Sequence, residues 1–445
     1  MNTKIVTIFL LIIVPFTVFS QSYPDQQIIL KNGSELLSNI EESKNIIQNS
    51  NNSLELASDA LDGYFILKPQ NSDDYFNRGL PSWNGFAPEN ENSSFKVMMR
   101  FKVYNQWQRW VTVGYWDKEI WSSYGYTSFT GGNIAIDYVK LNEYISEFQF
   151  KVVFKRNSTN YAPPSIEQLS FFVSDSKTTD NLSLTDIYND NPDEIFIPTD
   201  HIYQYDVDDE IGADICSPST TSMILKSYDI NVDPYEFALR TKDKYWDLFG
   251  VWPRVVQHAH EYGLEGTVNR YRTWSEAYEA LKSGKRIAMS IGQPLYSGHL
   301  VMLAGFDKNG NPIVHDPAKS DGYSKVYSKY DISKAWFNKG GIAYTFYFNE
   351  NTTAIEDIEN LNKSVKISPN PVTGKFTISV NIEKTTKLSI SIADIKGVLI
   401  GKILEKEKVL DGKYILPVNE DLTPGIYFIK LKTNETTVVK RLIKR

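Results

Sequence analysis

Runs of aromatic and β-branched residues predict strands in the first part of the chain. Such runs recur between residues 62 and 175, as in FKVMMRFKVYN, RWVTVGYW, IAIDYVKL and FQFKVVFKR. Clusters of turn residues separate these runs at the spacing typical of a β-sandwich. The pattern predicts an all-β sandwich over 62–175, preceded by a polar lead-in over 21–61.

Helical and strand patterns both occur between residues 198 and 350. Helices are predicted by SPSTTSMILKSY, WPRVVQHAHEYG and TWSEAYEALKSG, the last with a capping box at Thr273 and Glu276 and a stop at Gly284. Strands are predicted by RIAMSIG, HLVMLAGF and PIVHD, with DKNGN as the hairpin turn between the last two. Helices followed by antiparallel strands indicate an α+β domain.

Short alternating strands return in the last part of the chain. FTISVNI, LSISIAD, GIYFIKLK and TVVKRLIKR are separated by Gly, Pro and Asp turns, and this segment is basic while the rest is acidic. We expect a small, separate β-sandwich over 364–445. The polar segments 176–197 and 351–363 are the expected linkers between the three domains.

The start of the chain and its net charge indicate an exported protein that does not bind nucleic acid. Residues 1–20 carry Lys4, an apolar run and a small residue at Ser20, which is the pattern of a secretory signal peptide. The net charge of −7 is spread along the chain rather than gathered in blocks. A nucleic-acid-binding protein is expected to show a basic face instead.

Cys216 is the single cysteine among 445 residues, so it has no partner for an internal disulfide. In an exported protein, a lone thiol is either incidental or a nucleophile. It precedes Ser217, a good helix N-cap, and Pro218, which suits the first helical position. The thiol is therefore predicted at a helix N-terminus, where unpaired amides stabilise a thiolate. A buried structural cysteine is the alternative.

A cysteine nucleophile needs a base, and the base needs an orienting acceptor. His299 lies at the edge of an apolar strand that returns through a hairpin to Asp316, so the Asp316 carboxylate is expected to accept from the ring of His299. A structural role for His299 stays open. His315 competes as the base, but alternation along PIVHD points it to the face opposite Asp316.

The remaining polar candidates carry weaker signals. His258 and His260 lie two residues apart on a predicted helix and point to different faces, so we expect surface or satisfied interior histidines. The chain shows no metal-ligand spacing, and no cofactor is expected. An oxyanion requires donors, which the Cys216 backbone amide and the side-chain amide of Gln204 are expected to supply, although a surface glutamine is the simpler interpretation of Gln204.

Gln204, the strings CSPSTTSM and GHLVMLAGF, and Asp316 with Pro317 together resemble the bacteriocin-processing papain-like cysteine peptidases that cut after double-glycine leaders, and more closely their exported stand-alone relatives. The resemblance covers about residues 198–348. It implies a papain-like fold in which Cys216 is the nucleophile, His299 the base, Asp316 its orienting group and Gln204 an oxyanion donor. Two features depart from the family: the glutamine lies farther from the cysteine, and CSPST replaces CSPTS.

The outer regions carry resemblances of their own. LPSWNGFAP and VTVGYW resemble the β-rich domain that precedes such peptidases in some exported bacterial proteins. Trp83, Trp107 and Trp116 are expected in its core, with stacking on a glycan as the alternative. The C-terminal segment resembles the sorting domain of the type IX (Por) secretion system of Bacteroidetes. Its markers are Pro369-Asn370-Pro371, Asp394 with Gly397, Gly425-Ile426-Tyr427 and the basic end around Lys440.

These observations predict an exported three-domain cysteine hydrolase that acts on peptide or amide bonds. The sorting domain implies contact with the type IX secretion machinery, passage through the periplasm and outer membrane, and release or surface attachment. An amidase or transpeptidase on cell-wall or small amide substrates is an alternative, because the same residues serve any acyl transfer. An inactive papain-like module that binds glycan or protein at the surface is the other.

Overall fold

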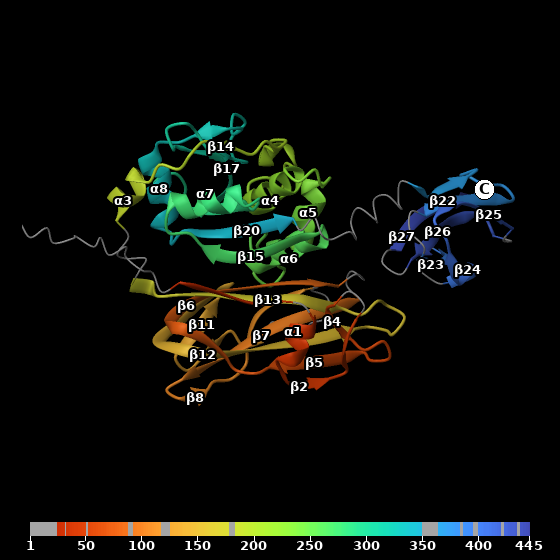
Figure 1. Cartoon of the computed structure of the whole chain (residues 1–445), viewed down its shortest axis with the longest axis horizontal. Helices are drawn as coiled ribbons and strands as arrows, with labels where there is room; N and C mark the ends of the chain where they lie inside the picture. The colour runs from red at the N-terminus through yellow and green to blue at the C-terminus, as the bar shows by residue number, and fades with distance from the viewer. Residues whose placement is uncertain are drawn as a thin grey trace, which may run out of the picture.

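The structure is a computed structural model that describes residues 25–31, 33–49, 52–87, 92–116, 125–177, 183–348, 364–382, 386–394, 399–419, 422–433 and 437–445. The expected signal peptide and the linker at 351–363 lie outside these residues. Buried apolar side chains form three large cores, in an N-terminal, a central and a C-terminal region (Figure 1). The protein is thus multidomain and largely β-structure, with few helices.

Thirteen described strands of the N-terminal region join one network of antiparallel pairs. Strand β7 illustrates why these segments form strands. Its residues are alternately buried and half-buried along most of its length, so one face of the strand packs on the core. The strands are β1 Gln26–Lys31, β2 Ile40–Lys44, β3 Ile46–Gln48, β4 Leu54–Leu56, β5 Asp62–Leu67, β6 Gln70–Phe86, β7 Ser93–Val103, β8 Gln106–Trp107, β9 Val111–Trp116, β10 Ser128–Phe129, β11 Gly132–Ala135, β12 Tyr138–Arg156 and β13 Ser165–Ser174.

The segment expected as a polar lead-in, residues 21–61, differs from that expectation. It contains β1 to β4 and the short helix α1 (Gly33–Ser38). β1 pairs with β13 along its whole length, and β2 pairs with β5. Leu30, Leu36 and Leu54 are buried in the N-terminal core. The apolar positions are too few for a periodic pattern, so the pairing partners rather than local alternation define these strands.

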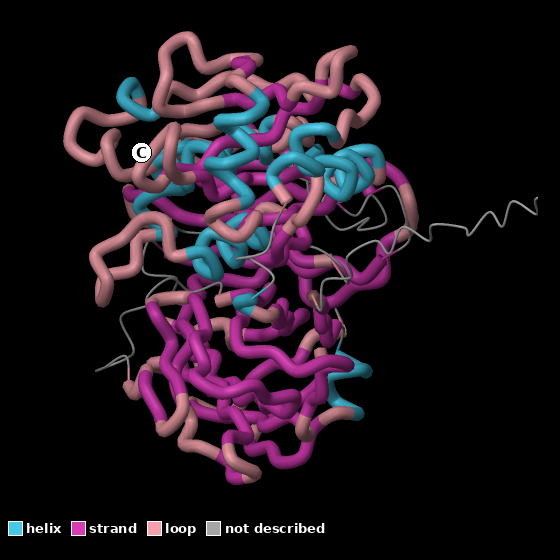
Figure 2. Tube along the Cα trace, turned by 90° about the vertical axis from the view of Figure 1, so that its left-hand side faces the viewer, coloured by secondary structure: helices cyan, strands magenta, loops and turns pink. Residues whose placement is uncertain are grey.

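The central region combines a seven-stranded sheet with helices, which Figure 2 shows gathered in this part of the molecule. The helices predicted at Thr273 and Trp252 are confirmed, and the Thr273 side chain accepts from the Glu276 amide at 3.1 Å. The elements are α3 Leu184–Asn189, β14 Ile195–Phe196, the 3₁₀ turn η1 Gln204–Asp206, α4 Cys216–Lys226, α5 Pro234–Thr241, α6 Trp252–Glu261, β15 Leu264–Arg270, α7 Trp274–Lys282, β16 Arg286–Ile291, β17 His299–Phe306, β18 Pro312–His315, β19 Lys325–Val326, α8 Lys329–Phe337 and β20 Ile342–Phe348.

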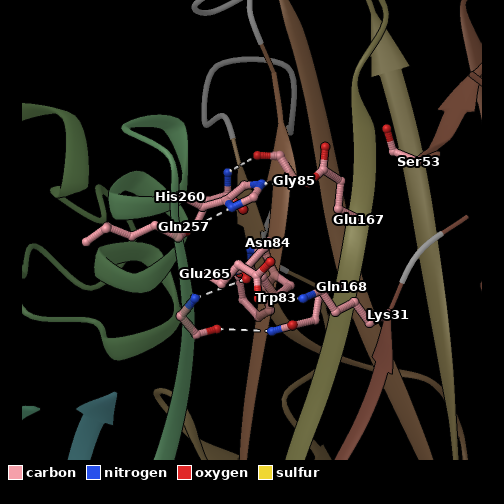
Figure 3. Close-up of polar contacts among 12 residues, drawn as sticks. Lys31, Ser53, Trp83, Asn84, Gly85, Glu167, Gln168, Gln257, His260 and Glu265 are labelled. Carbon is pink, nitrogen blue, oxygen red and sulfur yellow. Dashed lines mark hydrogen bonds and ion pairs between the residues drawn. The ribbon is translucent and has the colours of Figure 1, made fainter. Parts of the chain in front are cut away.

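The N-terminal and central regions pack directly against each other through β6 and β13 on one side and α6 and β15 on the other (Figure 3). The Gln257 side chain donates to the Gly85 carbonyl at 2.5 Å, and Gln168 donates to the carbonyl of Gly266 at 3.1 Å. Leu80 and Phe172 of the N-terminal region belong to the core of the central region. The two regions therefore share buried apolar and polar contacts.

The C-terminal region consists of two small antiparallel sheets around one core and is β-sandwich-like. One sheet has the order β21-β22-β25 and the other β24-β23-β26-β27. The strands are β21 Lys366–Ser368, β22 Phe376–Ile382, β23 Thr386–Asp394, β24 Leu399–Val409, β25 Gly412–Val418, β26 Gly425–Lys432 and β27 Thr437–Lys444. Across the described residues, no helix combines the length and apolar character needed to cross a membrane.

Candidate active site

Helix α4 begins at Cys216, two residues earlier than the sequence predicts. Its N-cap is Ile215, which provides no side-chain cap, so Ser217 lies inside the helix and its hydroxyl instead pairs with that of Tyr344 at 2.8 Å. Thr220 donates to the Leu300 carbonyl at 3.0 Å, which fixes the helix against β17. The half-buried thiol thus sits at a helix start whose amides lack a side-chain cap.

His299 and Asp316 come from neighbouring strands of the central sheet. β17 pairs with β18 so that Met302 lies opposite His315, which places Asp316 opposite Val301, on the same face as His299. The two side chains meet with 2.8 Å between His299 Nε2 and Asp316 Oδ1. The pairing of β17 with β18 shifts by one residue at a β-bulge next to Gly305. Because a shift of one residue exchanges the two faces of a strand, the bulge determines that Asp316, and not His315, lies on the same face as His299.

Two tyrosines hold the Asp316 carboxylate on its other side. Tyr296 and Tyr327 donate to Oδ2 at 2.7 and 2.6 Å, and the Ala318 amide donates to Oδ1 at 2.9 Å. The Asp316 side chain is fully buried, and its charge is compensated by these donors together with His299. Asp316 is thereby fixed in the orientation that receives the imidazole.

Charge and hydrogen bonding favour a protonated His299. Burial lowers the pKa of His299, but hydrogen bonds with Asp316 and with the Cys216 side chain outweigh burial and raise it to about 9. Burial raises the pKa of Asp316, but hydrogen bonds from His299 and the two tyrosines lower it to about 2. Since Nε2 of His299 faces Asp316, Nδ1 is the ring nitrogen left for Cys216. The arrangement favours a positively charged imidazolium on His299, held by the Asp316 carboxylate.

His315 faces away from this cluster. It is fully buried, its Nδ1 accepts from the Ser324 amide at 3.1 Å, and its Nε2 lies 3.2 Å from the Ile197 carbonyl. Its ring stacks on Tyr323. His315 therefore acts as a packing residue, as alternation along the strand predicts.

Gln204 is buried in η1, on the segment that leads to Cys216. Its backbone amide donates to the Pro317 carbonyl at 2.8 Å, which links it to the chain just after Asp316. Its side-chain amide donates to the Gly212 carbonyl at 2.7 Å, and Oε1 has no hydrogen-bond partner among the described residues. The surface position considered for Gln204 is thus wrong, and one amide hydrogen of the side chain is already used.

His258 and His260 lie on α6 at the contact with the N-terminal region. His258 Nδ1 lies 3.0 Å from Glu261 Oε2, and its ring packs on Phe237 and Trp116. His260 Nδ1 lies 3.0 Å from the Leu264 carbonyl. Both are buried, but His260 Nε2, 3.3 Å from Glu167 Oε2, has no hydrogen-bond partner among the described residues, so only His258 fits the expected satisfied interior histidine. Within the ranges that the structure describes, no group of three His, Cys, Asp or Glu side chains is placed to hold a metal ion.

The N-terminal region also reaches the surroundings of α4. Asp137, in the tight turn between β11 and β12, accepts from the Trp252 amide at 2.8 Å, and burial raises its pKa to about 7. Burial, and to a lesser extent the negative charge of Asp137, raises the pKa of Tyr344, whose hydroxyl forms a hydrogen bond with that of Ser217. No motif near Asp137 indicates this contact, because the link to Ser217 arises only when the two regions pack together.

Three further residues of the site carried no signal in the sequence analysis. The sequence around Tyr296 and Tyr327 shows only an aromatic residue close to a turn, which does not indicate a functional role. Lys339 lies just after α8, at a position that no motif marks. The Lys339 ammonium lies close to the residues that flank His299. Only the folded arrangement brings these side chains to the site.

Comparisons with solved structures give weak likenesses. PorZ, a surface component of the type IX secretion system of Porphyromonas gingivalis, is 11% identical, with 33% of this chain and 21% of that chain covered and a TM-score of 0.15. A β-glucuronidase of glycoside hydrolase family 2 is also 11% identical, with 37% and 23% covered and the same TM-score. The β-glucuronidase of Faecalibacterium prausnitzii is 8% identical, with 86% and 37% covered, again at 0.15.

This chain spans about a fifth of the length of the first two of these structures, and at such TM-scores none of the likenesses carries an argument. No curated protein matches the chain.

Two family models match separate segments. The Secretion system C-terminal sorting domain matches residues 366–445, which assigns the protein to type IX secretion, to contact with its machinery, and to the cell surface or the extracellular space. The site described above lies inside the other match. Residues 196–344, which hold Cys216, His299 and Asp316, match the Peptidase_C39 like family.

Proposed function

We propose that residues 198–350 have a papain-like α+β fold and hydrolyse peptide or amide bonds with Cys216, His299, Asp316 and Gln204, and that the N-terminal region is a β-sandwich. The observation that carries the proposal is the position of the His299 ring, which hydrogen-bonds to Asp316 and lies near enough to the side chain of Cys216 for that side chain to raise its pKa. A nucleophile, a base and an orienting acceptor in series are the parts that a cysteine hydrolase needs. The family match over 196–344 supports it.

The reaction proceeds by acyl transfer. The thiol proton moves to His299 Nδ1, where Asp316 stabilises the resulting imidazolium, and Cys216 Sγ forms a bond to the carbonyl carbon. The negative oxygen forms beside the Cys216 amide and the second amide hydrogen of Gln204. His299 then gives its proton to the leaving nitrogen as the C–N bond breaks, which leaves a thioester. Water, deprotonated by His299, attacks the thioester and releases the acid and the thiol.

The proposal is tested by the reactivity of the thiol, because the chain has one cysteine and any alkylation is therefore assigned to Cys216. We expect iodoacetamide to modify the mature protein at pH 7 much faster than it modifies free cysteine, and His299→Asn to abolish this advantage. Cys216→Ser is expected to remove hydrolysis of a casein or peptide-library substrate without changing the circular dichroism spectrum. A thiol no more reactive than free cysteine would refute the proposal.

The same site would serve an amidase or a transpeptidase, and substrate assays separate these from a peptidase. Mass spectrometry of products from peptides, cell-wall fragments and small amides distinguishes hydrolysis from transfer to an added amine. An inactive binding module is the other alternative. It predicts an unreactive Cys216 even though His299 stands beside it.

A second candidate function is glycan binding by the N-terminal region. Trp83 and Trp116 are fully buried and not available for stacking, as expected for core residues, and Trp107 is half-buried. A surface groove of about 330 Å³ elsewhere in this region is lined by exposed aromatic rings, Tyr75 and Tyr104, beside polar groups. Aromatic faces with a few polar neighbours suit a sugar ring.

Tyr104 occupies a turn position with φ +51°, where asparagine is preferred over a bulky residue. Tyr104→Asn therefore relieves the turn while removing the ring. On a glycan array, this variant is expected to lose binding while its melting temperature stays equal or rises. Tyr126→Asn, at another exposed tyrosine of the same region, is the control. Equal binding by the wild type and Tyr104→Asn would refute a sugar site in this groove.

A further inference from the structure

Lys339 brings a positive charge to the edge of the proposed catalytic site. Its Nζ donates to the carbonyl of Ile291 at 3.1 Å, and Ile291 pairs with His299 across β16 and β17. A Cβ atom built on Gly298, the residue before His299, would lie 3.6 Å from the same Nζ. The ammonium therefore lies directly over the backbone that leads into His299.

Among the described residues, no carboxylate lies within ion-pair distance of the Lys339 ammonium. The side chain is half-buried. The Ile291 carbonyl takes one of its three N–H groups. Burial lowers the pKa of Lys339, and the nearby Cys216 acts in the opposite direction. A half-buried ammonium without a carboxylate partner among the described residues is stabilised when a further anion completes the site.

We propose that Lys339 is a specificity-determining residue that receives a substrate carboxylate beside the bond that Cys216 attacks. The inference rests on the proposed hydrolase function and adds its substrate class: peptides or amides with an anionic group next to the scissile bond. The carboxylate belongs either to an acidic side chain or to a free C-terminus. Both present the same planar anion to the remaining N–H donors of Lys339.

Alkylation with two reagents of different charge tests the inference without a known substrate. Iodoacetate carries a carboxylate and iodoacetamide does not, so the ratio of their rates at Cys216 reports the positive charge around the thiol. We expect Lys339→Met to lower the iodoacetate-to-iodoacetamide ratio about fivefold, the size expected for loss of one nearby charge. Lys339→Arg should restore most of the ratio. Lys334→Met, at a lysine on α8 shortly before Lys339, should leave it unchanged.

Peptide substrates separate the two sources of the carboxylate. One pair of peptides differs by Glu against Gln at the residue beside the cleaved bond, and another by a C-terminal acid against a C-terminal amide. We expect Lys339→Met to reduce kcat/KM for the anionic member of one pair by more than tenfold while the neutral member changes less than twofold.

A ratio unaffected by Lys339→Met would overturn the inference and leave the hydrolase proposal standing. Equal losses for the anionic and neutral members of both pairs would do the same, because they would indicate a structural role for Lys339. A wild-type thiol that reacts with neither reagent would overturn the hydrolase proposal itself, and this inference with it.

Discussion

Replacing Asp316 with Asn removes the negative charge behind His299 while keeping the shape of the side chain. The side chains of His299 and Asp316 are 5% and 0% exposed, so solvent screens their interaction little. The pKa of His299 stands at about 9 against an ordinary value of 6.5. We expect His299 in Asp316→Asn to titrate about two pH units lower, because burial then acts on the imidazolium with less opposition.

The size of the effect follows from both partners. For His299 the difference of about 2.5 pH units corresponds to roughly 3 kcal/mol, and this figure includes the contribution of Cys216. For Asp316 the fall from 3.8 to about 2 corresponds to roughly 2 kcal/mol, and it includes the two tyrosines. Both figures are net of burial, which opposes the charged form of each residue, so they give the scale of the interaction between His299 and Asp316 rather than its exact size.

The sign of the pH dependence also follows. A pKa that is raised on folding contributes stability that is complete below pH 6.5 and is lost as the pH rises through about 9. The lowered pKa of Asp316 contributes stability that is present above pH 3.8 and is lost as the pH falls through about 2. The wild type should therefore lose more unfolding free energy than Asp316→Asn between pH 7 and 10.

The assay is an NMR titration of isotope-labelled histidine in the mature protein, with His299 assigned by its loss in His299→Asn. The same titration in the Cys216→Ser variant shows how much of the raised pKa of His299 depends on the thiol. Asp321→Asn, at an exposed carboxylate five residues beyond Asp316, is the control and should leave the His299 titration unchanged. A His299 midpoint in Asp316→Asn within half a pH unit of the wild type would refute the reasoning.

Two further predictions concern the frame around the site. Gly305 has φ +145°, and a Cβ there would lie 1.9 Å from the Ile195 carbonyl oxygen. Gly305→Ala should lower the unfolding free energy by more than about 1 kcal/mol in urea titrations, and by more than Gly284→Ala, whose added Cβ meets no atom within 4 Å. Equal losses would mean that φ alone matters. The buried Arg254 donates to the Tyr115 carbonyl across the two regions at 2.8 Å, so Arg254→Met should lower the melting temperature by several degrees. An unchanged calorimetric transition would contradict this.

Local pattern was sufficient for most elements near the site. The capped helix at Thr273, the strand from His299 and the hairpin to Asp316 were all predictable, because each depends on neighbours within a few residues. The helix at Cys216 was predicted to begin two residues too late. Ser217 has the chemistry of an N-cap, but its hydroxyl is held by Tyr344, more than a hundred residues away.

Long-range contacts decided what the sequence analysis missed. Tyr296 and Tyr327 reach Asp316 only because the strands pair in one register, and Lys339 reaches Gly298 only after α8 packs beside β16. The strands within residues 21–61 likewise form by pairing with strands far along the chain, as β1 does with β13. Neither periodicity nor composition encodes such contacts locally.

The shared contacts between the N-terminal and central regions have a consequence for maturation. Proteolysis that removed the N-terminal strands would leave the Gly266 carbonyl without Gln168 and would open an apolar face of the central core, to which Leu80 and Phe172 now contribute. Such a fragment is expected to aggregate rather than to gain activity. We therefore expect the N-terminal region to remain attached to the central region in the working form of the protein.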